Sequence, residues 1–170
     1  MLGPAPVVDF DGTVAHLKVD WITLRAELEV ATIDDLWKQQ RAEGWDIVAR
    51  AEAEAAGRAQ IVPVVEEGLI AARAVAILTS NAEQAVGQFL ARYPDLERRV
   101  AIVVGRETLR GPKTDFAVFE RGFNRCVDRT RAARGDAPVV YLGDRAYELG
   151  FARRLGAAAL KPQDLLADPR

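Results

Sequence analysis

The stretch that decides the fold is residues 7–14, which read VVDFDGTV. Two β-branched residues, Val7 and Val8, are followed at once by Asp9 and Asp11, and the glycine after them favours a turn. Short apolar runs that end in polar residues are typical of buried parallel strands. The stretch therefore predicts a short buried strand that places two carboxylates at one end of a sheet.

Four more apolar runs follow along the chain, and helical patterns lie between them. The runs cover Val75–Leu78, Val100–Val104, residues 139–142 and residues 157–160. Apolar residues recur at helical steps over residues 82–93, 114–131 and 146–155. Strands that alternate with helices predict an α/β fold, a Rossmann-like doubly wound parallel sheet with right-handed crossovers.

Residues 15–73 interrupt this alternation, because they contain almost no strand signal. Trp21, Leu24 and Leu28 share one helical face, and residues 49–59 are rich in Ala, Glu and Arg, which favour helix. We therefore expect a small all-helical cap at residues 15–73, inserted into a core made of residues 1–14 and 74–170. The polar tail after residue 161 predicts one helical turn at residues 164–167.

Polar residues follow three of the predicted strands, and one lysine stands at a predicted helix start. They are Asp9 and Asp11 after the first strand, Thr79, Ser80 and Asn81 after the second, Lys113 after Gly111 and Pro112, and Asp144 and Glu148 after the fourth. The carboxyl ends of parallel strands share one edge of the sheet, and ligands bind at that edge in open α/β sheets. We expect these side chains to converge there.

Carboxylates gathered in one pocket repel each other by roughly 4 kcal/mol per close pair at an effective dielectric of 20. A bound divalent cation or an ammonium group offsets that repulsion. With one histidine and one cysteine in the chain, HExxH and Cys-rich zinc sites are excluded, and oxygen ligands suit Mg²⁺. An acidic pocket with a metal and a lysine suits phosphate-ester hydrolysis through an aspartyl-phosphate.

In order and spacing, these groups resemble the four motifs of the haloacid dehalogenase (HAD) superfamily. DFDGTV at residues 9–14 is similar to the family's DxDGT[LV], and ILTSN at residues 77–81 resembles its second motif. Lys113 resembles the motif lysine, and GDRAYE at residues 143–148 resembles GDxxxD, with Glu148 where the family often has Asp. The resemblance covers nearly the whole chain. The helical insert resembles a C1-type cap, as in phosphoglycolate phosphatase-like members.

The resemblance implies a Mg²⁺-dependent phosphatase that hydrolyses a small phosphomonoester through an aspartyl-phosphate on Asp9. Asp11 would protonate the leaving oxygen and then activate water, and its presence favours phosphoryl transfer over C–halogen cleavage. The implied metal ligands are Asp9, Asp11 through its carbonyl, Asp144 and Glu148, the last as a direct or an outer ligand. The implied phosphate-binding residues are Gly12, Thr13, Thr79, Ser80, Asn81 and Lys113. Lys113 would also be catalytic, because it would hold Asp9 and the phosphate together and balance their charge.

Other functions fit parts of this pattern. A phosphotransferase or mutase would use the same intermediate, and a non-catalytic binding or regulatory protein could share the fold. A P-loop is disfavoured because five residues rather than four separate Gly105 from Gly111, and because Pro112 removes a backbone donor. A receiver domain is disfavoured because its phosphorylated aspartate follows a central strand, with an acidic pair earlier in the chain.

Composition limits the partners. The formal net charge of −2, without a dense Lys/Arg block, argues against nucleic acid. No apolar run approaches the ~20 residues that a membrane helix needs. We therefore expect a small phosphorylated metabolite as partner, a cytoplasmic setting, and a monomer or homodimer. We also expect the three tryptophans to form the core of the cap, His16 to lie at a hinge or on the surface, and the helix near Ala51 to be solvated.

Overall fold

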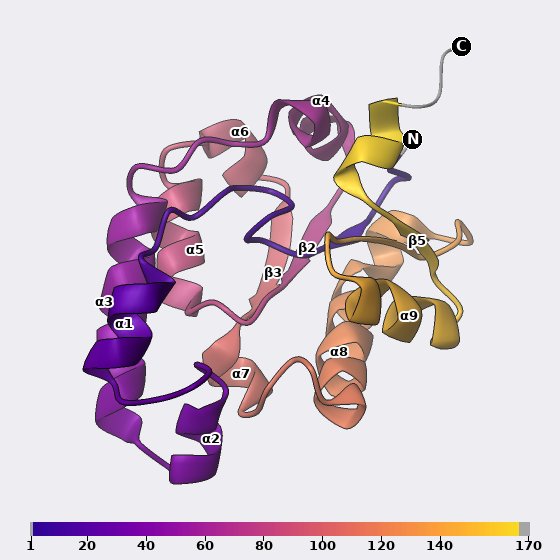
Figure 1. The fold of residues 1–170 in the computed structure, drawn as a ribbon. Helices are drawn as coiled ribbons and strands as arrows, with labels where there is room; N and C mark the ends of the chain where they lie inside the picture. The colour runs from indigo at the N-terminus through magenta and orange to yellow at the C-terminus, as the bar shows by residue number, and fades with distance from the viewer. Residues whose placement is uncertain (1, 167–170) are drawn as a thin grey trace.

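A computed structural model describes residues 2–166, which form a five-stranded parallel sheet in the order β3-β2-β1-β4-β5 with helices around it (Figure 1). The elements are β1 (Val7–Val8), α1 (Trp21–Glu27), α2 (Asp35–Gln39), α3 (Ala42–Ala56), α4 (Pro63–Ala71), β2 (Val75–Leu78), α5 (Glu83–Leu90), α6 (Pro94–Glu97), β3 (Val100–Val104), α7 (Arg106–Leu109), α8 (Phe116–Arg134), β4 (Val140–Leu142), α9 (Ala146–Arg154), β5 (Ala158–Leu160) and the 3₁₀ helix η1 (Pro162–Leu166). The predicted α/β class and parallel sheet are confirmed.

All five predicted strands form, and the first of them lies at the centre of the sheet. Val8 pairs with Ile77 of β2 on one side and with Leu142 of β4 on the other. β4 and β5 each begin one residue later than the sequence predicts, at Val140 and Ala158. Both residues of β1 are fully buried, so this strand positions the following aspartates from the middle of the fold.

Successive strand residues point to opposite faces of the sheet, and each face has its own core. Val8 and Ile77 pack with Val86 and Phe89 of α5 on one face. On the other face, Val7, Ala76 and Leu78 pack with residues of α8 and α9, which include Phe119, Phe123, Cys126 and Leu149. The helical patterns at residues 82–93, 114–131 and 146–155 are thus confirmed as the helices that cover the sheet.

The insert between β1 and β2 is helical, as predicted, and it packs in two parts. The first part, α1, α2 and the start of α3, has a small core of its own, formed by Leu24, Leu28, Leu36 and Val48. The end of α3 and all of α4 pack instead against the face of the sheet that carries α5. The chain leaves and re-enters the core where Ala15 bridges Ile61, and the Val62 N–H donates to the Val14 carbonyl at 2.8 Å.

The C-terminal turn is the 3₁₀ helix η1, which begins two residues before the predicted turn at residue 164. The predicted end of that turn, Ala167, lies outside the described residues. Among residues 2–166, no helix combines the length and the apolar character needed to cross a membrane.

Candidate active site

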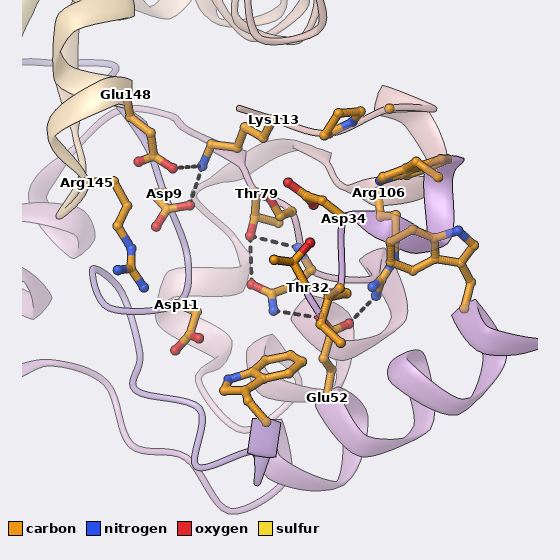
Figure 2. Close-up of a pocket in the computed structure, with 18 of the residues that line it drawn as sticks. Asp9, Asp11, Thr32, Asp34, Glu52, Thr79, Arg106, Lys113, Arg145 and Glu148 are labelled. Atoms are coloured by element: carbon orange, nitrogen blue, oxygen red, sulfur yellow. Dashed lines mark hydrogen bonds and ion pairs between the residues drawn. The ribbon is translucent and has the colours of Figure 1, made fainter. Parts of the chain in front are cut away.

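The carboxyl edge of the sheet brings together residues from four distant parts of the chain. Asp9 directly follows β1, Thr79 directly follows β2, and Asp144 lies two residues after β4. Together with Lys113 and Glu148, Asp9 and Thr79 line a cavity of about 420 Å³, which Figure 2 shows in close-up. The predicted convergence of the strand ends thus produces a concave polar site.

Lys113 lies in the turn before α8, and its ammonium group is the centre of the site. It donates to Asp9 Oδ1 at 2.5 Å and to the Leu78 carbonyl at 2.9 Å, and it pairs with Glu148 Oε1 at 2.8 Å. The side chain is fully enclosed. Burial by itself lowers the pKa of Lys113, but the two carboxylates outweigh burial and leave the pKa above its usual value. Lys113 therefore stays charged and fixes one oxygen of Asp9.

Asp9 is a buried carboxylate at the end of the central strand. Burial raises the pKa of Asp9 to about 7, while Lys113 acts in the opposite direction and Glu148 and Asp144 add repulsion. A carboxylate must be ionised to act as a nucleophile. A cation bound nearby would lower the pKa of Asp9 and favour its ionised form.

The acidic groups beside Asp9 fit a hard cation. Asp9, Asp144 and Glu148 each offer an oxygen, and these oxygens lie within 4.8 Å of one another. Asp144 Oδ1 is buried and has no hydrogen-bond partner within residues 2–166. Three carboxylates, one of them with a buried unpartnered oxygen, form the oxygen-only ligand set that Mg²⁺ prefers. The residues present therefore fit the metal that the sequence predicts.

Glu148 has a second set of contacts, which the sequence did not indicate. Its carboxylate accepts hydrogen bonds from the Tyr141 hydroxyl at 3.0 Å and from the Tyr147 hydroxyl at 3.2 Å, besides pairing with Lys113. These contacts fix the carboxylate in place whether or not a cation is bound. Glu148 therefore holds the lysine in position and also belongs to the group of three carboxylates that could hold a cation.

Asp11 faces the same cavity from the loop after β1 (Figure 2). Its Oδ1 accepts the Leu17 N–H at 2.8 Å, which fixes the carboxyl at the start of the insert. Burial raises the pKa of Asp11 above its usual value, although the Leu17 hydrogen bond lowers it. A partly buried carboxyl of this kind can carry a proton next to a leaving group.

The second motif lies against the cavity wall. Thr79 is buried, and its hydroxyl donates to Asn81 Oδ1 at 2.8 Å. Asn81 is buried as well, and its Nδ2 donates to Glu52 at 3.0 Å. Ser80 is exposed and lines the cavity. All three predicted residues thus reach the cavity, and Asn81 holds the Thr79 hydroxyl.

Gly12 and Thr13 lie in the turn that follows β1, and the proposal that they bind phosphate stays a prediction. The Gly12 N–H donates to the Ala15 carbonyl at 2.7 Å, and the Thr13 N–H donates to the Phe10 carbonyl at 3.2 Å. Neither residue lines the cavity, and Thr13 is fully buried. Their amides close the turn that leads into the insert, and Gly12 makes room for Asp144.

Comparisons with known proteins find structures of similar fold but no relative by sequence. No protein-family model matches the sequence, and the search of curated proteins finds no match. The UTR4 protein of Saccharomyces cerevisiae has a similar structure, with a TM-score of 0.57 at 14% identity, over 92% of this chain and 88% of that one. An L-2-haloacid dehalogenase from Xanthobacter autotrophicus, with chloropropionic acid covalently bound, matches with a TM-score of 0.55 at 17% identity, over 97% and 81%.

A third neighbour is a HAD-superfamily hydrolase of subfamily IA, variant 1, from Geobacter sulfurreducens. It matches with a TM-score of 0.53 at 13% identity, over 93% of this chain and 86% of that one. This chain has the haloacid dehalogenase fold. These three structures share the HAD fold with this chain over most of their lengths.

One buried ion pair in this HAD fold was not predicted from the sequence. Glu52 of α3 pairs with Arg106 of α7, and both side chains are almost fully enclosed. Glu52 also accepts the Ala82 N–H at 2.9 Å and the Asn81 amide. Burial raises the pKa of Glu52, although Arg106 lowers it. The helix around Ala51 is thus not simply solvated, since one of its glutamates joins the insert to the second motif.

The three tryptophans and the histidine also differ in part from expectation. Trp21 and Trp45 pack against the small core of the insert, as predicted, but all three tryptophans line the cavity. His16 is exposed and lies in a separate hollow near Ile61, close to the point where the insert begins. Periodicity alone places these tryptophans on helices, but it does not show that they line the cavity.

Proposed function

We propose that this chain is a Mg²⁺-dependent phosphatase that hydrolyses a small phosphomonoester through an aspartyl-phosphate on Asp9. The observation that carries the proposal is the arrangement of Asp9. Its carboxylate is fixed by Lys113 at 2.5 Å, in a cavity that also receives Asp11, and it lies beside two further carboxylates. This arrangement supplies a nucleophile, a proton carrier and a cation site together.

In the first step, an oxygen of Asp9 attacks phosphorus and the bond from phosphorus to the leaving oxygen breaks. Asp11 donates its proton to that oxygen, so an alcohol departs and the phosphoryl group remains on Asp9. Lys113 keeps Asp9 in place and balances charge on the phosphoryl oxygens. Thr79 and Ser80 lie on the cavity wall, where the Ser80 hydroxyl can donate to those oxygens and the Thr79 hydroxyl would do so by turning away from Asn81.

In the second step, Asp11 takes a proton from water, and the resulting hydroxide attacks the phosphorus of the acyl phosphate. The bond between phosphorus and Asp9 breaks, which releases inorganic phosphate and regenerates both aspartates. Asp9, Asp144 and Glu148 would hold Mg²⁺, and that ion would neutralise charge on the phosphoryl oxygens and favour the ionised form of Asp9.

Asp11 favours phosphate esters over halogenated acids as substrates. An alkoxide is a poor leaving group unless it is protonated, whereas a halide leaves without a proton. A carboxyl with a raised pKa near the nucleophile can protonate the alkoxide in the first reaction, whereas the second has no leaving group that needs a proton. Some structural neighbours are named as dehalogenases, and the binding of chloropropionic acid in one of them is covalent.

The test measures phosphate release from a panel of phosphomonoesters, with and without Mg²⁺, alongside chloride release from 2-chloropropionate. We expect Mg²⁺-dependent phosphate release and no chloride release. Asp9→Asn should lose on the order of 10³-fold or more in kcat, and Asp11→Asn about 10²–10⁴-fold. Activity of Asp9→Asn near the wild-type rate, or chloride release without phosphate release, would overturn the proposal.

A further inference from the structure

The insert gives the cavity an aromatic wall. The chain has three tryptophans, Trp21 of α1, Trp37 of α2 and Trp45 of α3, and all of them line the cavity that contains Asp9. Each of these side chains is half-buried. The core thus supplies the reacting groups, while the insert supplies indole rings.

Neighbouring side chains hold two of the indole rings in place. The centroids of Trp37 and Trp45 lie 4.6 Å apart, and the Arg106 guanidinium lies 4.6 Å from the centroid of Trp45. Trp45 and Trp21 also pack against the small core of the insert, whereas Trp37 is not part of that packing. Trp37 is therefore supported by Trp45 and leaves ring surface to the cavity.

Three polar side chains on this wall use part of their hydrogen-bonding capacity within the protein. The Thr32 hydroxyl donates to Asp35 at 3.0 Å, and the Asp34 carboxylate accepts from the Thr114 hydroxyl at 3.1 Å. Arg25 donates to two backbone carbonyl oxygens of the insert. A sugar with many hydroxyl groups needs open hydrogen-bond partners, because an unpaired polar group costs free energy on burial. Besides these partly engaged polar groups, the wall offers a ligand the ring surface of the tryptophans.

On the basis of the proposed function, we propose that the leaving group of the substrate is a flat aromatic ring that packs against Trp21 and Trp37. The substrate class is thus a phosphomonoester of an alcohol that carries an aromatic ring. A cavity of about 420 Å³ has room for a phosphoryl group and one ring system. Rings in contact prefer offset or edge-to-face packing, which a saturated ring of similar size cannot reproduce.

The kinetic test compares benzyl phosphate with cyclohexylmethyl phosphate. Both esters release a primary alcohol, and they differ in whether the six-membered ring is aromatic. We expect kcat/KM to be at least tenfold higher for benzyl phosphate. Trp37→Leu should bring the ratio close to one, while Ile22→Ala should keep the wild-type ratio, because Ile22 is next to Trp21 on α1 and is 76% exposed. Equal values for the two esters in the wild type would overturn the inference.

A binding test separates this inference from the proposed reaction. Benzylphosphonate and cyclohexylmethylphosphonate have no ester bond to break, so calorimetric titration of the wild type with Mg²⁺ measures recognition alone. At least tenfold tighter binding of benzylphosphonate is expected even if neither ester is hydrolysed. In that case the proposed function fails and the aromatic site stands. Equal binding, or no binding of either compound, sinks the aromatic site whatever the enzyme hydrolyses.

Discussion

At the scale of single residues, Gly12 controls the position of a carboxylate. Its φ of +86° lies in the region that favours glycine, and a Cβ at this position would come within 2.6 Å of Asp144 Oδ2. The missing side chain therefore allows Asp144 to approach the loop after β1. This is a more specific reason for the glycine than the phosphate contact that the sequence predicted.

Gly12→Ala should therefore impair the cation site. We expect the Mg²⁺ concentration for half-maximal activity to rise at least tenfold, because the new methyl group displaces Asp144. Gly156→Ala is the matched control, since Gly156 has a similar φ of +83° but a Cβ there would meet no atom of residues 2–166 within 4 Å. The control should lose some stability and keep its Mg²⁺ requirement; similar Mg²⁺ requirements in both variants would refute this explanation.

The sequence predicted the position of a site residue wherever that residue follows the end of a strand. Val8 pairs with Ile77 and with Leu142, so the residues that follow these three meet at one edge. Asp9, Thr79 and Asp144 could thus be found from the sequence. Glu52 could not, because a glutamate in a helix rich in Ala, Glu and Arg looks the same whether it is buried or solvated.

At the scale of elements, α3 joins the insert to the core. Its start carries residues of the small core around Leu36 and Val48, and its end packs against the sheet. Between these regions, Glu52 forms an ion pair with Arg106 and accepts a hydrogen bond from Asn81 of the second motif. The helix also has an exposed pair at its end, in which Arg58 donates to Glu54 at 2.9 Å.

These two ion pairs give a matched comparison. Glu52→Ala leaves Arg106 buried without its charge partner, so we expect the free energy of unfolding to fall by about 3–5 kcal/mol. Glu54→Ala removes a pair whose side chains are both more than half exposed, and we expect a change below about 0.5 kcal/mol. Urea unfolding of both variants measures the difference; equal losses would contradict the role given to Glu52.

The start of α3 shows why element boundaries were harder to predict than the elements themselves. The sequence indicated helix from Ala49, but α3 begins at Ala42. Gly44 lies in the added turns, and glycine disfavours helix by about 1 kcal/mol relative to alanine. A Cβ at Gly44 would come within 2.8 Å of a terminal methyl of Leu36, so close packing against α2 favours the glycine despite its low helix propensity.

At the scale of the whole molecule, the acidic cluster links stability to the cation. Asp9, Asp144 and Glu148 are brought together only in the folded chain, where they repel one another. A cation that binds the folded state alone stabilises it by about 2.7 kcal/mol at 100 times its Kd. The sheet and its helices were predictable from hydrophobic pattern, whereas this coupling depends on distances that only the fold sets.

Saturating Mg²⁺ should therefore raise the Tm by about 5–10 °C, given about 2–4 °C per kcal/mol for a protein of this size. Asp144→Asn should abolish most of this shift, because it removes one ligand charge. Asp95→Asn is the control, since Asp95 is exposed and forms an ion pair with Arg98 at the end of its own helix, away from the acidic cluster. Differential scanning calorimetry with and without Mg²⁺ gives the answer, and an equal shift in both variants would place the cation elsewhere.

The most direct test of the central claim, that Asp9 takes up the phosphoryl group, is a rapid acid quench. Enzyme in excess is mixed with an aryl phosphate and Mg²⁺, quenched within milliseconds, digested and examined by mass spectrometry. We predict a transient phosphoryl group on Asp9 in the wild type and none in Asp9→Asn. A phosphoryl group on another side chain, or phosphate release by Asp9→Asn at the wild-type rate, would contradict the account.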